Sequence, residues 1–112
     1  MPGYVSNKDR IEKVVKKYEK PFFFAEAGCM STEGSKFRPN DWNLQGDIDI
    51  SGQAQWFKAM FEAVSKRVFV SGFFIWDWKA DLYSQGSAVE DKEYAIYGKE
   101  AENVIREAYG RF

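Results

Sequence analysis

The stretch that decides the fold reads Pro21-Phe22-Phe23-Phe24-Ala25-Glu26-Ala27-Gly28. From about Phe22 to Ala25 its residues are apolar without interruption, which is typical of a parallel strand covered on both faces. The run then delivers one carboxylate, Glu26, where the chain turns into a loop that carries a glycine. Because a lone charge at the end of a buried strand needs a reason, Glu26 is the first candidate for a functional residue.

A second strand and three helices surround this stretch. The largely apolar run from Val68 to Trp76 predicts another buried strand. Three further segments carry apolar residues at positions i, i+3, i+4 and i+7, the spacing of an amphipathic helix. These residues are Ile11, Val14, Val15 and Tyr18; Phe57, Met60, Phe61 and Val64; and Ala101, Val104, Ile105 and Ala108. Strands that alternate with helices predict an α/β fold with parallel strands and right-handed crossovers.

We treat residues 1–112 as one unit, because a chain of this length has little core to divide between domains. Ser6 or Asn7 can cap the first helix, and Pro21 ends it. The predicted parts are an N-terminal helix in residues 1–21, a first strand, long loop and helix in residues 22–66, and a second strand, loop and helix in residues 67–112.

The composition argues against several classes of protein. Sixteen basic and seventeen acidic side chains leave a net charge of -1 without a basic block, so we expect no nucleic-acid partner. The chain has no histidine, which removes Ser-His-Asp and Cys-His catalysis. Cys29 is the only cysteine, so it cannot form an intramolecular disulfide. No apolar run approaches the roughly 18 residues that span a bilayer, and we therefore expect no membrane partner and a cytoplasmic location.

The sequence also gives little reason to expect a metal or a cofactor. The segment that starts at Asp47 begins like a calcium loop, but Lys58 stands at the twelfth position, where a bidentate glutamate is required. Capping of the second helix by Asp49 or Ser51 explains this segment better. The glycines are scattered and lack the Lys-Ser/Thr pair that follows a phosphate-binding loop.

Two strands are too few to form a stable sheet, because both edges stay unpaired. Neighbouring strands must come either from a longer protein or from other copies of the chain. Four copies of two strands would close an eight-stranded barrel without edges. Met1 opens the chain and a helix occupies its end, so we expect a self-contained unit that assembles into a homotetramer, with a fragment of a longer barrel as the alternative.

Four segments together resemble the C-terminal quarter of a clan A glycoside hydrolase, and glycoside hydrolase family 113 is the most similar family. The similarity covers about residues 18–108. Its segments are Pro21 to Gly28, Gln53 to Trp56, Gly72 to Trp78 and Gly98 to Ala101. The resemblance implies a quarter of a TIM barrel and an enzyme that hydrolyses β-linked sugars.

The resemblance also implies roles for individual residues. In such enzymes strand seven ends in the nucleophilic glutamate, which corresponds to Glu26, and strand eight ends in a tryptophan that floors the sugar subsite, which corresponds to Trp76 or Trp78. The family takes its acid/base glutamate from strand four, and this chain has no equivalent of the first six strands. Because retaining hydrolysis needs two carboxyl groups about 5 to 5.5 Å apart, one subunit offers only half of the pair.

A second carboxyl group has two candidate sources. In a fourfold ring Glu26 of another subunit would converge on the same axis. Asp77 is the competing candidate within the chain, although strand alternation sends it to the side opposite Trp76 and Trp78 unless a bulge intervenes.

The long loop offers further sugar contacts. Trp42 is a candidate for a subsite wall or a loop anchor, and Asn40 beside it could bind sugar hydroxyls. Trp56 is expected to pack against the sheet. A salt-bridged strand end remains the structural alternative for Glu26, and a non-catalytic carbohydrate-binding or purely structural barrel unit remains the alternative function.

Overall fold

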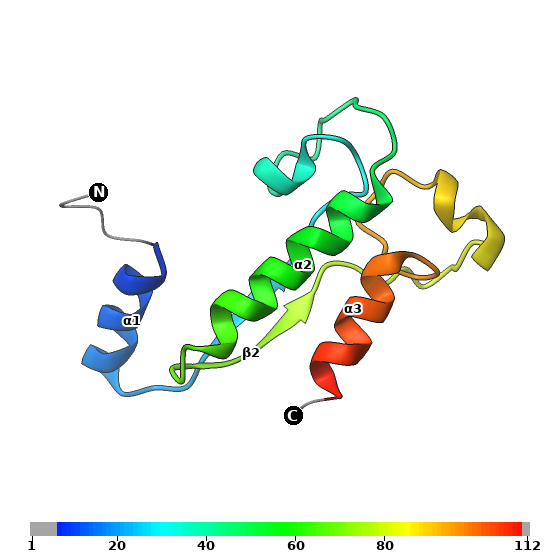
Figure 1. Cartoon of the computed structure of the whole chain (residues 1–112). Helices are drawn as coiled ribbons and strands as arrows, with labels where there is room; N and C mark the ends of the chain where they lie inside the picture. Colours follow the sequence, from blue (N-terminus) through cyan, green and yellow to red (C-terminus); the bar gives the residue numbers. More distant parts are fainter. Residues whose placement is uncertain (1–6, 111–112) are drawn as a thin grey trace.

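The computed structural model describes residues 7–110, with side chains from residue 9 onward. The predicted cap Ser6 and the outermost ends of the predicted unit lie outside these residues. The elements are α1 (Asn7–Tyr18), β1 (Phe22–Ala27), the 3-10 helix η1 (Ser35–Phe37), α2 (Ile50–Ser65), β2 (Val70–Ile75), the 3-10 helix η2 (Gln85–Glu90) and α3 (Glu100–Tyr109), as Figure 1 shows. The predicted order of helices and strands is confirmed.

The two strands lie side by side and run parallel, so the predicted α/β fold with parallel strands is confirmed. Phe22 of β1 pairs with Val70 of β2, and Ala27 pairs with Ile75. Within residues 7–110 they form a two-stranded sheet. Both carboxyl ends therefore lie at the same end of the sheet, which is where α/β proteins place their ligands.

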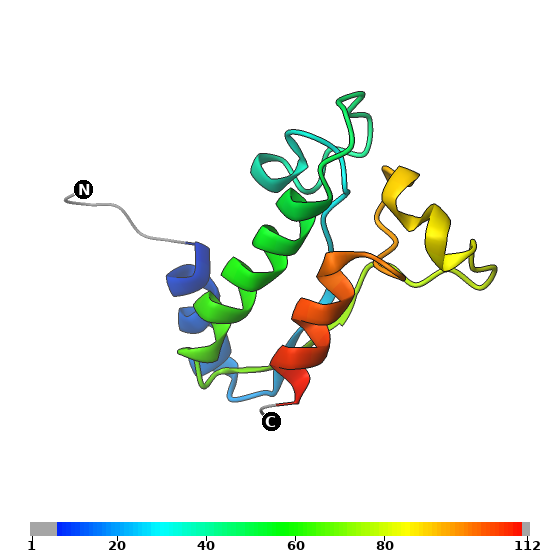
Figure 2. The same ribbon diagram turned by 45° about the vertical axis from the view of Figure 1, so that its right-hand side comes forward.

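The core lies between this sheet and two helices. α2 and α3 pack on one face of the strands, as Figures 1 and 2 show together. Phe61 of α2 meets Phe73 of β2 with ring centroids 5.1 Å apart. The buried cluster consists of Ala54, Phe57, Phe61, Ile96, Ala101, Ile105 and Ala108. The apolar stripes predicted for the second and third helices are therefore the surfaces that build the core.

The other face of the sheet is left open by the residues that the structure describes. Phe23 is 52% exposed and Phe74 is 64% exposed, and their rings meet edge to face at 5.5 Å. The expectation that the strands are covered on both faces is thus met on one face only. The physical reason is that two strands and their helices can cover one side, whereas the second side needs further strands.

Helix α1 lies on the side of α2 away from α3 in both views (Figures 1 and 2). The Arg67 guanidinium donates to Asp9 at 2.9 Å and to Glu12 at 3.0 Å, which ties α1 to the turn after α2. Two residues of its predicted apolar stripe, Val14 and Tyr18, stay exposed. Hence α1 carries an apolar surface that the described part of the chain leaves largely uncovered.

Helix α2 begins with a side-chain cap. The Asp49 carboxylate accepts a hydrogen bond of 3.0 Å from the Gly52 amide, which satisfies one of the free donors at the helix start. Of the two predicted caps, Asp49 is the one observed, while Ser51 lies inside the helix and is exposed. The explanation of this segment as a helix start is therefore confirmed.

Candidate functional site

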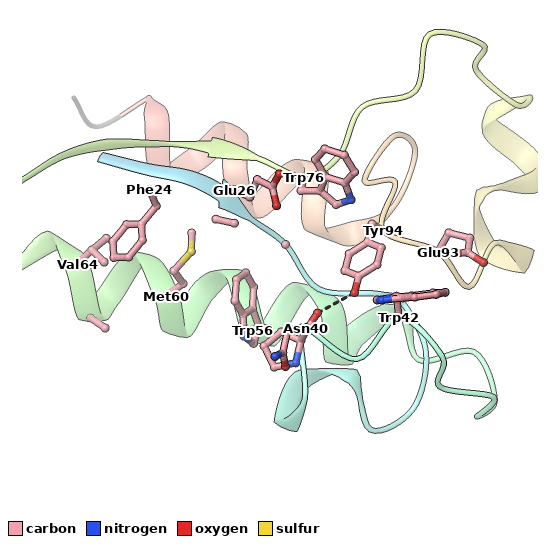
Figure 3. A pocket seen from close by; sticks show the side chains of 14 residues that line it. Phe24, Glu26, Asn40, Trp42, Trp56, Met60, Val64, Trp76, Glu93 and Tyr94 are labelled. Carbon is pink, nitrogen blue, oxygen red and sulfur yellow. Dashed lines mark hydrogen bonds between the residues drawn. The ribbon is translucent and has the colours of Figure 1, made fainter. Parts of the chain in front are cut away.

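A pocket of about 860 Å³ lies at the carboxyl end of β1, between this strand, α2 and the two long loops (Figure 3). Its polar end brings together residues from β1, from the end of β2 and from both loops. They are Glu26, Trp76, Asn40, Trp42, Glu93 and Tyr94. Its apolar end lies between β1 and α2 and includes Phe24, Met60 and Val64. Four of the residues predicted for the site from the sequence therefore share one cavity.

Glu26 lines the pocket at a point where the strand is irregular. Regular alternation would place Glu26 on the same side as Phe22 and Phe24, which are half-buried. The pairing with β2 shifts register between Phe24 and Ala27, and Glu26 is exposed. A local irregularity of this kind can re-aim a side chain at a strand end. The carboxylate consequently faces the cavity and not the core.

Trp76 follows β2 directly, lines the pocket and is 48% exposed. Its backbone amide donates to the Ala27 carbonyl at 2.8 Å, so the ends of the two strands stay paired. Gly28 makes this approach possible, since a Cβ atom there would lie 2.2 Å from the Trp76 carbonyl oxygen. The indole and the Glu26 carboxylate are therefore held on neighbouring, directly bonded strand ends, and Figure 3 shows them adjacent.

The loop after β1 supplies the opposite wall. Asn40 and Trp42 both line the pocket, and Trp42 is 71% exposed. The Tyr94 hydroxyl donates to the Pro39 carbonyl at 2.9 Å and so joins this loop to the loop after β2. Trp56 is half-buried: it packs edge to face on Phe57 and also lines the pocket. The packing predicted for Trp56 thus describes only part of its environment, because the side chain also lines the pocket.

Tyr94 and Glu93 are pocket residues that sequence reasoning missed. Burial raises the pKa of the Tyr94 hydroxyl above its ordinary value, and the nearby Asp41 and Glu93 charges act in the same direction, so the group remains a hydrogen-bond donor at neutral pH. Figure 3 places the Glu93 carboxylate at the far side of the cavity from Glu26. Neither residue sits in an apolar periodic segment, and no local signal singles them out.

Two predicted site residues lie outside the pocket. The Asp77 carboxylate pairs with the Lys79 ammonium at 3.0 Å, and its second oxygen is buried without a hydrogen-bond partner among the described residues. Trp78 is exposed and packs edge to face on Tyr97 with ring centroids 5.4 Å apart. Of these three consecutive residues, only Trp76 lines the pocket. The pocket therefore gives no geometric support for catalysis by Asp77 or for sugar binding by Trp78.

Beneath the pocket, polar groups tie the two loops together. Gln53 is fully buried on α2, and its amide nitrogen donates to the Cys29 carbonyl at 2.8 Å and approaches the Tyr94 carbonyl at 3.4 Å. The Thr32 hydroxyl donates to the Lys92 carbonyl at 2.5 Å. Burial raises the pKa of the Cys29 thiol, which favours its neutral form. A polar network that includes the Cys29 carbonyl thus joins the two loops.

Across residues 7–110, no cluster of three or more potential metal ligands among His, Cys, Asp and Glu side chains occurs. Within the same residues, no helix has both the length and the apolar character needed to cross a bilayer. The side chains that line the pocket offer two carboxylates, aromatic faces and amide or hydroxyl groups.

The family model of Glycoside Hydrolase Family 113 matches residues 3–99 of the chain. The chain belongs to glycoside hydrolase family 113. This confirms the resemblance inferred from the four sequence segments.

Solved structures of the same family are similar along nearly the whole chain. A structure of a GH113 β-1,4-mannanase is 47% identical with a TM-score of 0.91, and a complex structure of a GH113 β-1,4-mannanase is 46% identical with a TM-score of 0.92; each match covers 94% of this chain. The GH113 β-mannanase AaManA from Alicyclobacillus acidocaldarius, in complex with ManMIm, is 37% identical with a TM-score of 0.87 over 91% of this chain.

This family 113 chain spans about a third of the length of those proteins, since the matches cover 34%, 34% and 33% of their chains. The comparison with curated proteins gave no match. The similarity therefore establishes the family and the fold of a barrel segment.

Proposed function

We propose that this family 113 chain supplies part of the active site of a glycoside hydrolase that cleaves β-1,4-linked mannosides with retention of configuration. The observation that carries the proposal is that Glu26 and Trp76 end neighbouring parallel strands and line one pocket. A carboxylate beside a flat aromatic face fits a sugar ring whose anomeric carbon is attacked. The names of the similar structures, both β-1,4-mannanases and a β-mannanase, support the choice of substrate.

In this proposal Glu26 is the nucleophile. Its carboxylate attacks the anomeric carbon while an acid protonates the leaving oxygen, and water then hydrolyses the glycosyl-enzyme bond with the same acid acting as base. Trp76 floors the subsite next to Glu26. Trp42 and Asn40 contact the sugar from the loop after β1, with the indole offering a stacking face and the amide hydrogen bonds.

In this proposal the second carboxyl group comes from outside this copy of the chain. Glu93 is the other carboxylate that lines the pocket, and it lies across the cavity from Glu26. We propose two sources of a carboxyl at the required separation: Glu26 of another copy in a homotetrameric barrel, or a residue of further barrel strands in a longer polypeptide. The exposed faces of Phe23 and Phe74 support completion by either route, since both place new strands against them.

The flanking helices set a condition on the homotetramer. A ring of four copies pairs β2 of one copy with β1 of the next. Because α1 and α3 lie on opposite sides of α2, such a ring brings α3 of one copy and α1 of the next to the same seam. The homotetramer thus requires both helices to fit there, or one of them to move outward.

The test replaces Glu26 by Gln in the chain in its completed form, either the assembly of copies or the longer barrel. We expect turnover of β-1,4-linked manno-oligosaccharides to fall by roughly 10³-fold or more, because the amide removes the nucleophile while preserving shape. The matched control is Glu33→Gln. Glu33 is an exposed glutamate in the loop after β1 and does not line the pocket. This variant should keep the wild-type rate.

Two results would contradict the proposal. Undiminished turnover by Glu26→Gln would remove Glu26 from the mechanism. Proton NMR of the first-formed reducing end should show the β-anomer, and initial release of the α-anomer would exclude retention. A wild-type protein that binds manno-oligosaccharides without cleaving them would instead support the alternative function, a non-catalytic carbohydrate-binding unit, which the lone carboxylate beside Trp76 favours.

A further inference from the structure

A lysine ammonium is buried between the two loops that form the pocket. Lys99 directly precedes α3, and its side chain is fully inaccessible to solvent. Its Nζ donates to the Asp91 carboxylate at 2.7 Å, to the Ser31 hydroxyl at 2.9 Å and to the Glu93 carbonyl at 3.2 Å. All three donors of the ammonium are thereby used, and the partners come from both loops.

Burial of the Lys99 ammonium at the start of α3 is energetically unfavourable, and a stabilising effect on the helix does not account for it. A cation at a helix N-terminus opposes the helix dipole, and Lys99 caps α3 at that end. Removing an ammonium from water is also unfavourable unless it is paired. Burial lowers the pKa of Lys99 below its ordinary value, although the hydrogen bond with Asp91 acts in the opposite direction. The contribution of Lys99 therefore lies in the groups that its ammonium joins.

The groups joined are the backbones of the two loops. Ser31, in the loop after β1, accepts from Lys99 and donates its own hydroxyl to the Asp91 carbonyl at 2.5 Å. The Ser31 amide also donates to the Glu93 carbonyl at 3.1 Å. Lys99 completes this unit by holding Asp91 and Glu93 together. The loop after β2 is thus fixed against the loop after β1 directly before Tyr94.

The segment that Lys99 holds in place forms one wall of the pocket, whereas Lys99 itself does not line the pocket. Glu93 and Tyr94 line the cavity, and they follow Asp91 within three residues. Glu26 and Trp76 are placed by the pairing of the strand ends, and the one direct bond among the described residues from this part to the wall is the long contact of 3.4 Å from the Asp77 amide to the Tyr94 carbonyl. Loss of Lys99 would consequently shift one wall of the pocket and leave the carboxylate and its neighbouring indole in place.

We propose that Lys99 is a positioning residue for substrate binding, which holds the Glu93–Tyr94 wall at the correct distance from Glu26 and Trp76. The proposal rests on the proposed function in one respect, namely that a sugar chain occupies the pocket. It assigns to a buried lysine an influence on substrate affinity without contact to the substrate.

The kinetic test compares Lys99→Met with Lys58→Met, which replaces an exposed lysine of α2, in the completed protein. We expect KM for a manno-oligosaccharide to rise about tenfold in Lys99→Met, the loss of one well-placed sugar contact, with kcat little changed. Lys58→Met should match the wild type. A residue that only stabilised the fold would instead lower the apparent kcat through the active fraction and leave KM unchanged, and that result would overturn the proposal.

A second variant guards against failure of Lys99→Met to fold. Asp91→Asn keeps the volume of the side chain and removes the charge that pairs with Lys99. It should raise KM in the same direction, and the double variant should show no more than the larger single effect, because both residues act as one unit. Fully additive effects on KM, or an unchanged KM in Asp91→Asn, would contradict the proposed role.

A third measurement does not depend on activity. Amide hydrogen exchange of the wild type and Asp91→Asn should show faster exchange at Ser31, whose amide bonds to Glu93, while β1 exchanges as in the wild type. Unchanged exchange at Ser31 would overturn the inference even in an active enzyme. If the wild type neither bound nor cleaved mannosides, the proposed function would fail while faster exchange at Ser31 still supported the structural role of Lys99.

Discussion

Glu26 lies where the pairing of β1 with β2 shifts register, and this backbone irregularity affects the environment of its carboxylate. Uninterrupted pleating would turn its carboxylate toward the half-buried side of β1, where an unpaired charge is costly. At the register shift before Ala27, Glu26 is exposed and lines the pocket, to which Phe24 also contributes. Gly28, two residues after Glu26, then allows the backbone of Trp76 to come close. The chemistry proposed for this site thus depends on backbone geometry as much as on the side chains.

Replacement of Gly28 by Ala should test this dependence. The added Cβ would meet the Trp76 carbonyl oxygen, so the strand ends must separate. We expect a loss of about 1 to 3 kcal/mol in the free energy of unfolding, the usual cost of overpacking, together with weaker sugar binding. Denaturant titration and isothermal calorimetry with a manno-oligosaccharide measure the two effects.

Gly86→Ala is the matched control, because its Cβ would meet no atom within 4 Å. It should leave both quantities near the wild-type values. Equal losses in the two variants would show that glycine removal in general, and not the contact with Trp76, causes the effect.

Helices and strands of this chain differ in how visible they are in the sequence. The spacing of apolar residues such as Phe57 and Phe61 predicted α2, because a helix repeats its buried face every three to four residues. The 3-10 helices η1 and η2 were not predicted, since their short turns show no such repeat. Tyr94 was missed for a related reason: it joins the site through a hydrogen bond to Pro39, 55 residues earlier in the chain.

The start of α2 permits a prediction about one element. Asp49→Ala removes the carboxylate that caps the helix, and we expect the free energy of unfolding to fall by about 1 kcal/mol. Asp47→Ala changes an exposed aspartate of the same segment and should cost much less. Thermal and urea unfolding of both variants give the comparison. A larger loss in Asp47→Ala would contradict the assignment of Asp49 as the cap.

Within residues 7–110 the two strands present an open face and two free edges, which explains why the predicted quarter barrel could be recognised but not its completion. The local pattern encodes strands that need cover on both sides. It does not encode whether the cover is a copy of the chain or a different segment. The four residues Glu26, Trp76, Trp42 and Asn40 line one pocket because strand ends and their loops gather at one end of a parallel sheet.

Light scattering should decide how the barrel closes. If copies of the chain close it, the mass will be four times the 13.0 kDa of one chain. Phe74→Asp should then abolish the tetramer, because a closed barrel buries this open face and with it an unpaired charge. Phe37→Asp, at an exposed position of η1, is the control and should assemble normally. A wild-type protein that stays at the mass of one chain would end the homotetramer proposal.

The hydrogen bonds that join the two loops have a consequence for protein engineering within the family. They are made by Ser31, Thr32, Gln53 and Lys99. A specificity loop transplanted alone from a related enzyme would arrive without the donors and acceptors that its recipient offers. Successful chimeras should therefore exchange both segments and their buried tethers as one cassette.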